Sequence, residues 1–139
     1  MDLLALIDAA ERLVPDEPGW LLEASTIADQ ITSLVLSDPT HLEAVRTSVR
    51  AVAAFEECDA IVGASPAANE IVKSFNAGAC ASTRVLLFDL VGVTGAAFDS
   101  AASTMGHLEV VPAALVNAGS RSRAGVLPRS VGLGDLVSR

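Results

Sequence analysis

The chain has 139 residues, of which 51% are hydrophobic and 19% are charged, and its formal net charge is −8. This length fits one domain, residues 1–139, whose core needs neither a disulfide nor a structural metal. Nucleic acids and anionic membranes repel an acidic chain, so we expect neither as a partner. The apolar excess favours a face covered by a second copy, and we expect a homodimer.

The first third of the chain predicts helices. Apolar residues recur every three to four positions over residues 2–14, which indicates an amphipathic helix that Pro15 ends. This N-terminus is acidic where a signal peptide would be basic, and no apolar run is long enough for a membrane span, so we expect a cytoplasmic protein. Residues 20–36 fit a second helix, although part of that segment would also suit a strand.

Strands begin to alternate with helices in the middle of the chain. Asp38-Pro39, an N-cap acceptor followed by proline, predicts a helix that ends near Phe55. Residues 60–63 predict a short buried strand, and Ser65-Pro66 predicts the start of a helix that continues to about Phe75.

The second half of the chain continues this alternation. Residues 84–89 predict the clearest strand, followed by a loop at 90–95 and a helix over 96–105. A further strand is predicted over 108–115, interrupted by Pro112, and the glycine-rich remainder is expected to pack back on the sheet. The pattern predicts an α/β fold with a three-layer, open, mostly parallel sheet and helices on both faces. In such a sheet the ligand site lies beyond the carboxyl ends of the strands.

One segment, residues 85–97, has a pattern suited to binding a phosphate. An apolar strand leads to Asp89, and a short loop containing Gly92, Thr94 and Gly95 leads into a helix. Backbone N–H groups at a helix start favour an anion, and Asp89 could accept bonds from ribose hydroxyls or help to hold Mg²⁺. An ordinary strand end followed by a threonine N-cap has the same pattern, so both interpretations stay open.

This segment resembles the phosphoribosyl-pyrophosphate loop of the type I phosphoribosyltransferases, and residues 127–136 are faintly similar to the end of their orotate-specific branch. The resemblance implies a phosphoribosyltransferase-like core without a hood and places Asp89 at the reaction centre. It also implies a second loop at Ala64 and Ser65, where the family holds pyrophosphate. The implied phosphosugar loop comprises Asp89, Val91, Gly92, Val93, Thr94, Gly95 and Ala96.

The departures from this family pattern point away from catalysis. Leu90 occupies the position of the family's second acid, and Glu70 occupies a place where a carboxylate would repel pyrophosphate. Only residues 76–83 separate the helix near Phe75 from the next strand, which leaves no room for the mobile cationic loop of the active enzymes. Lys73 is the sole lysine, so little else can neutralise a leaving pyrophosphate.

We therefore expect a degenerate phosphoribosyltransferase homologue that binds a phosphosugar or nucleotide, or acts as a structural or regulatory subunit, without transferase turnover. One alternative is an active minimal enzyme that transfers ribose 5-phosphate to a nitrogenous base. Another is a pure protein-interaction domain with an empty loop. The expected partner is a small phosphorylated metabolite of nucleotide metabolism, with Mg²⁺ only alongside a phosphoribosyl ligand and no metal site otherwise. Neither the two histidines nor the two cysteines are spaced for a catalytic or metal site: His41, His107, Cys58 and Cys80.

Overall fold

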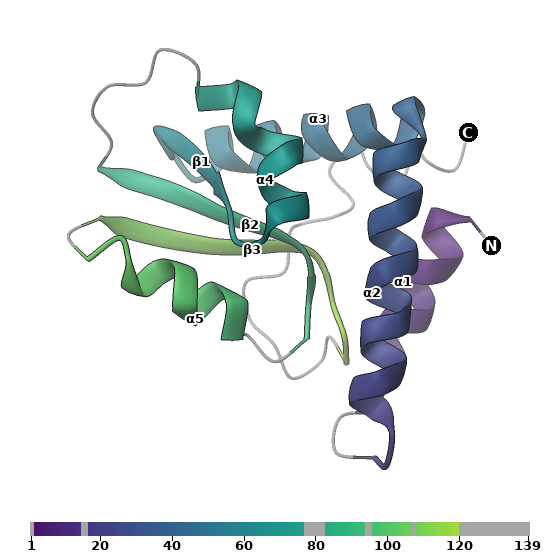
Figure 1. Ribbon diagram of the computed structural model, residues 1–139. Helices are drawn as coiled ribbons and strands as arrows, with labels where there is room; N and C mark the ends of the chain where they lie inside the picture. Colours follow the sequence, from purple (N-terminus) through teal and green to yellow (C-terminus); the bar gives the residue numbers. More distant parts are fainter. Residues whose placement is uncertain (1, 15–16, 77–82, 94–95, 107, 120–139) are drawn as a thin grey trace.

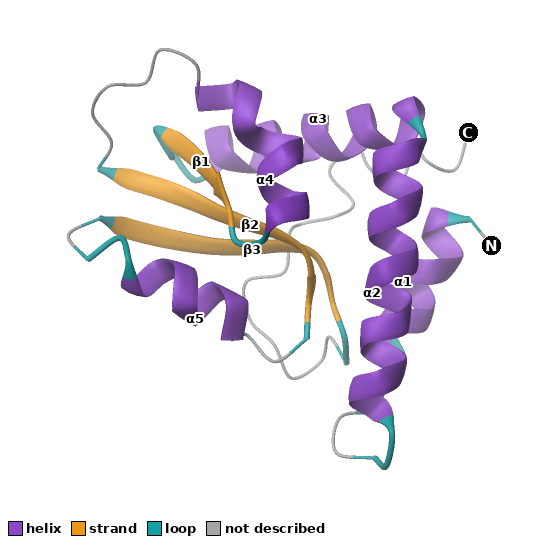
Figure 2. Cartoon of the chain, in the orientation of Figure 1, coloured by secondary structure: helices purple, strands orange, loops and turns teal. Residues whose placement is uncertain are grey.

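The computed structural model describes residues 2–14, 17–76, 83–93, 96–106 and 108–119. These form a three-stranded parallel sheet in the order β1-β2-β3 together with helices, so the predicted α/β class and parallel sheet are confirmed. In Figure 1, α4 lies in front of the strands and α3 lies behind them, and the coloured elements of Figure 2 show the same arrangement. The bounds of the elements are α1 Leu3–Glu11, α2 Trp20–Ser37, α3 Pro39–Phe55, β1 Ala60–Gly63, α4 Pro66–Val72, a 3₁₀ turn Lys73–Asn76, β2 Arg84–Gly92, α5 Ala96–Ser103 and β3 Glu109–Asn117.

Short polar side chains cap the starts of α1, α3 and α4, as the sequence predicts for Asp38 and Ser65 but not for Asp2. Asp2 accepts a hydrogen bond from the Ala5 N–H at the start of α1 (2.8 Å), and Asp38 accepts one from the Thr40 N–H at the start of α3 (2.9 Å). Residues 20–36 take the helical alternative, because Ala24, Ile31 and Val35 form one buried stripe. The predicted helices at 2–14 and 20–36 thus exist, although α1 ends at Glu11, short of the predicted limit.

The strands differ from prediction at their ends. β2 continues to Gly92, so the loop predicted from Leu90 is wrong over residues 90–92. Pro112 lies inside β3, which runs on to Asn117, and does not interrupt it. β3 is one of the two edge strands of the described sheet, where a missing N–H can face away from the neighbouring strand.

The core lies where the first helices meet the sheet. Phe88 and Leu86 of β2 and Leu115 of β3 are fully buried in one hydrophobic cluster with Ile31 of α2 and Val45 of α3, along with residues of α1 and α4. α1 contacts β3 and α2 contacts β2, so this helical pair closes one side of the strands. None of the described helices is long and apolar enough to cross a membrane. The predicted packing of the C-terminal remainder, residues 120–139, lies outside the described residues.

Candidate functional site at the carboxyl ends of the strands

All three parallel strands deliver a polar side chain near their carboxyl ends. Ser65 follows β1, Asp89 lies in the second half of β2, and Asn117 is the last residue of β3. Parallel pairing brings these strand ends to one edge of the sheet, the edge where open α/β sheets bind ligands.

Ser65 and Asp89 are in direct contact. The Ser65 hydroxyl donates to Oδ1 of Asp89 at 2.9 Å, and the same hydroxyl accepts a bond from the Ala68 N–H at 3.2 Å. The Leu90 N–H also donates to Oδ1, at 2.8 Å. A chain of hydrogen bonds therefore joins the first turn of α4 to the middle strand, and it connects the two segments that the family resemblance assigned to one ligand.

The Asp89 carboxylate is largely desolvated. Its residue is only 9% exposed, and this burial raises its pKa above the usual value. The bonds from Ser65 and from the Leu90 N–H act in the opposite direction, because they favour the ionised form, but they do not cancel the effect of burial on the pKa. A carboxylate that the fold holds at such a cost is a feature of functional sites as well as of buried structural networks.

The extension of β2 changes the setting of the predicted loop. Asp89 lies within the strand rather than at its tip, because Val91 and Gly92 pair in register with Val116 and Asn117 of β3. The predicted loop residues Val91 and Gly92 are thus strand residues, and Val93 is the first residue beyond the sheet. The structure of Thr94 and Gly95 lies outside the described residues, and α5 begins at Ala96.

The second predicted loop lies close to the first. The Ala64 N–H donates to the Phe88 carbonyl at 2.7 Å, one residue before Ser65 reaches Asp89. This close approach depends on Gly63, where an added Cβ would overlap the backbone of Asn69 and lie 2.6 Å from the carbonyl carbon of Ala68. The start of α4 is therefore pressed directly onto the end of β1.

Leu90 stands where the family places its second acid. It is 2% exposed and belongs to the hydrophobic core cluster. The fold uses this position for packing, and a carboxylate there would be buried without the solvation that it needs.

Charged side chains of α3, α4 and β2 are bonded to groups other than the Ser65–Asp89 pair. Glu70, expected in the second loop, lies in α4 and pairs with Lys73 at 2.9 Å. Arg46 donates to the Ile71 carbonyl at the far end of α4, at 3.0 Å. Arg84 lies at the opposite end of β2 from Gly92. None of these three cations is placed over the Ser65–Asp89 pair.

The histidine and cysteine side chains of the described residues lie apart from this site. Nδ1 of His41 is 3.2 Å from Oδ2 of Asp38 at the start of α3, within ion-pair distance, yet the alignment does not make a hydrogen bond. Burial raises the pKa of the Cys58 thiol, which reduces its reactivity at neutral pH. Within the described part of the chain, no three His, Cys, Asp or Glu side chains gather to form a metal site.

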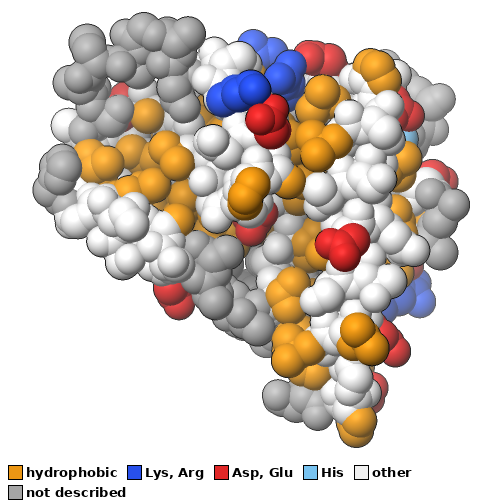
Figure 3. All heavy atoms as spheres, in the orientation of Figure 1, with side chains coloured by type: hydrophobic (Ala, Val, Ile, Leu, Met, Phe, Trp, Pro, Cys, Tyr) orange, Lys and Arg blue, Asp and Glu red, His pale blue; other side chains and the backbone are white. Residues whose placement is uncertain are grey.

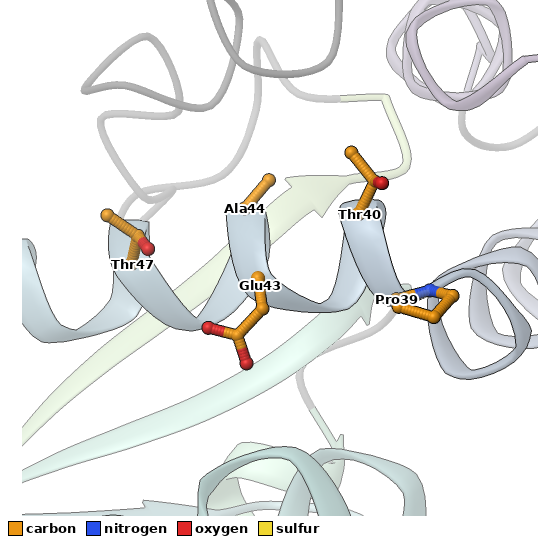
Figure 4. Close-up of a pocket in the computed structure, with 5 residues that line it drawn as sticks. All are labelled: Pro39, Thr40, Glu43, Ala44 and Thr47. Carbon is orange, nitrogen blue, oxygen red and sulfur yellow. The ribbon is translucent and has the colours of Figure 1, made fainter.

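A surface hollow of about 380 Å³ lies elsewhere, along α3. Figure 4 shows that its labelled side chains come from successive turns of that one helix. Polar groups from several elements do not converge there, unlike those at the strand ends. We therefore place the candidate site at the strand ends and not in this hollow, which is lined by Pro39, Thr40, Glu43, Ala44 and Thr47.

Asn117 and its contact with Gly92 were not predicted from the sequence. Asn117 is 5% exposed, and its Oδ1 occupies the place that a side chain at Gly92 would take. A lone asparagine after the apolar run Ala113–Val116 was the available signal, but only the register of β2 with β3 shows where it lies.

Comparisons of the chain with protein families, with curated proteins and with solved structures give no match.

Proposed function

We propose that the chain is a phosphoribosyltransferase-like protein that binds a phosphosugar or nucleotide at the carboxyl ends of its strands and does not transfer the sugar. The observation that carries this proposal is the hydrogen bond between Ser65 and Asp89 (2.9 Å). It brings together the two segments that the sequence resemblance assigns to one phosphosugar ligand.

The same geometry argues against turnover. A transferase must neutralise the charge that develops on a leaving pyrophosphate. Leu90 is buried in the core, and Lys73, Arg46 and Arg84 are paired with other groups. Binding is less demanding, because backbone N–H groups can hold a phosphate whatever side chains flank them.

Calorimetric titration with phosphoribosyl pyrophosphate, with and without Mg²⁺, tests the proposal. We expect binding by the wild-type chain, weaker binding by Ser65→Ala and Thr94→Ala, and unchanged binding by Glu109→Gln, whose side chain is exposed at the opposite end of the sheet. No heat at millimolar ligand would rule the proposal out. Consumption of orotate or a nucleobase in the same mixtures would instead support the active minimal transferase.

A protein-interaction role is the second candidate, and exposed apolar side chains favour it. Leu21 and Leu22, at the start of α2, are 49% and 74% exposed, and Val14, which lies between α1 and α2 in the chain, is 54% exposed. Figure 3 shows hydrophobic side chains on the end of the α1–α2 pair that projects beyond the sheet. If this surface binds a second copy, sedimentation will show a dimer that Leu22→Glu dissociates. A monomeric wild-type chain would contradict that role.

A further inference from the structure

The start of α2 and the turn before it expose apolar and acidic side chains together. Val14, Leu21 and Leu22 are exposed to solvent, and so are the carboxylates of Glu17 and Glu23. These five residues form the α2 tip. In Figures 1 and 3 this end of α2 extends beyond the strands, with hydrophobic side chains on its surface.

Backbone hydrogen bonds hold the α2 tip in one arrangement. The Glu17 N–H donates to the Val14 carbonyl at 3.3 Å, and the Trp20 N–H donates to the Glu17 carbonyl at 3.1 Å. The Glu23 N–H donates to the Gly19 carbonyl at 3.1 Å, in the first turn of the helix. The two exposed leucines therefore lie on a formed helical turn, which the preceding turn supports.

The core of the protein does not use these apolar side chains. The buried stripe of α2 begins at Ala24, which follows both leucines in the chain. Neither Leu21, Leu22 nor Val14 belongs to the hydrophobic core cluster. Neighbouring apolar side chains that stay in water and are rimmed by polar groups mark interaction surfaces. The α2 tip therefore has the character of a surface that a partner covers.

The charge around the α2 tip indicates the chemistry of that partner. Residues 1–38 contain eight Asp and Glu residues but one basic residue, Arg12, which pairs with Asp8 at 2.9 Å. Among the described residues, Glu17 and Glu23 take part in no ion pair. Such carboxylates complement lysine and arginine side chains across an interface. A second copy of the chain fits less well, because a two-fold contact would place two acidic surfaces against each other.

We propose that the α2 tip is a docking surface for a basic, amphipathic segment of another protein. The apolar face of that segment covers Leu21 and Leu22, and its cations pair with Glu17 and Glu23. Apolar anchors supply the affinity of such contacts, whereas the flanking charges select the partner. The proposal does not rest on the phosphosugar site, which other elements of the fold form.

Trp20 provides a direct readout of docking. It is the sole tryptophan, is partly buried, and immediately precedes Leu21. The probe is a synthetic peptide of about 18 residues, made only of leucine and lysine and patterned as an amphipathic helix. We expect a saturable shift of the Trp20 emission to shorter wavelength at low salt, and weaker binding in 1 M NaCl. No shift, or an equal shift with a peptide in which glutamate replaces every lysine, would overturn the proposal.

Three single substitutions locate the binding. Leu22→Gln removes the most exposed apolar side chain of the tip without adding charge, and should weaken peptide binding about tenfold. Glu23→Lys keeps the apolar surface and reverses one charge, so it should weaken binding at low salt but not in 1 M NaCl. Leu36→Gln, the same exchange at an exposed leucine in the last turn of α2, is the matched control and should bind as the wild type does. Equal losses at Leu22 and Leu36, or no effect of Glu23→Lys at low salt, would overturn the proposal.

Sedimentation without peptide separates this partner from a second copy. A dimer that Leu22→Gln dissociates would assign the α2 tip to a second copy and overturn the proposal. Sedimentation that Leu22→Gln leaves unchanged would support a tip that is free for another protein. Phosphoribosyl pyrophosphate titration keeps the two functions apart: Leu22→Gln should bind this ligand as the wild type does. A wild-type chain that does not bind it would overturn the proposed function and leave the docking surface intact.

Discussion

At the amino end of the sheet, Arg84 pairs with Glu56 and Glu109 in a partly exposed set of ion pairs, whereas at the carboxyl end Asp89 and Asn117 are buried. The Arg84 Nε–H also donates a hydrogen bond to the Glu56 carbonyl at 2.7 Å. Burial of the Asp89 carboxylate carries a desolvation cost that its hydrogen bonds only partly offset.

Asp59 completes this contrast. Its carboxylate accepts bonds from the Thr83 N–H and hydroxyl at 3.0 and 2.9 Å, and these bonds, the N–H first, lower its pKa. The fold thus stabilises the ionised form of Asp59 at one end of the sheet and disfavours that of Asp89 at the other. Bonds that favour the native charge state indicate a structural role for Asp59, whereas a carboxylate held against its preference occurs in functional sites as well as in buried structural networks.

The largest expected effect comes from the crowded carboxyl end. Gly63→Ala puts a methyl group onto the backbone of Asn69, which cannot move without shifting α4. We expect a loss of about 3 kcal/mol in the free energy of unfolding, measured by denaturant titration. Gly106→Ala is the control, because nothing lies within 4 Å of its added Cβ, and it should change stability by less than about 0.5 kcal/mol. Equal effects of the two substitutions would contradict the close packing of α4 on β1.

Substitutions at the amino end of the sheet should reduce stability less, and their effect should depend on the salt concentration. Arg84→Ala removes the pairs with Glu56 and Glu109, and we expect the melting temperature to fall by a few degrees at low salt. The difference should shrink in 1 M NaCl, where exposed ion pairs are screened. Arg12→Ala, which breaks only the exposed pair with Asp8, should have no measurable effect. An Arg84 effect that grows with salt would argue against stabilisation by its ion pairs with Glu56 and Glu109.

The pH dependence of stability should differ between the two ends. Because the folded-state pKa of Asp89 is raised, its contribution is fully present below its unfolded pKa and is lost as pH rises through the folded pKa. Asp89→Asn, which resembles the neutral acid, should therefore be as stable as the wild type or more stable at pH 7, and this advantage should disappear in acid. Melting curves from pH 3 to 8 measure it.

The contribution of Asp59 to stability should depend on pH with the opposite sign. Its lowered pKa contributes stability that is present above its unfolded pKa and is lost as pH falls through the folded pKa. Asp59→Asn should therefore be less stable than the wild type at pH 7, with the difference closing in acid. Parallel pH profiles for the Asp59 and Asp89 variants would remove the contrast drawn between the two ends.

The smallest expected effect is a gain in stability at Glu57, next to the amino end of the sheet. Glu57 has a positive φ of 57°, a left-handed conformation that costs a residue with a side chain more than glycine. Glu57→Gly should raise the free energy of unfolding by about 0.5 kcal/mol, because the relief of strain exceeds the added entropy of the unfolded chain. Glu17→Gly, at an exposed turn, should give no gain. A loss at Glu57 would show that its side chain contributes more than its strain costs.

Local signals predicted much of the fold because they act over a few residues. The Asp38 and Ser65 side chains accept hydrogen bonds from backbone N–H groups two and three residues further on, which marks each helix start locally. Both helices begin at the predicted prolines. The end of β2 was not predicted, since Leu90, Val91 and Gly92 suit a strand only when β3 lies beside them. Partner strands, not local preference, decide such boundaries.

The candidate site was likewise predicted only in part. Asp89 was predicted from the order of strand, loop and helix, whereas Ser65 was implied as a site residue only by the family resemblance, and the structure brings the two together. The contact of Asn117 with Gly92 depends on the register of two strands separated by a helix, which no local pattern encodes. Gly92 was expected only as a member of the implied phosphosugar loop, whereas the structure shows that its missing side chain also leaves room for Asn117.

A ¹⁵N–¹H correlation titration of the full chain with phosphoribosyl pyrophosphate tests the central claim most directly. We predict saturable shifts at the amides of Ser65, Leu90 and Val93, at the carboxyl end of the sheet, and no change at Thr83 or Glu109, at the amino end. Shifts confined to the amino end, or no shifts at millimolar ligand, would contradict the assignment of the site.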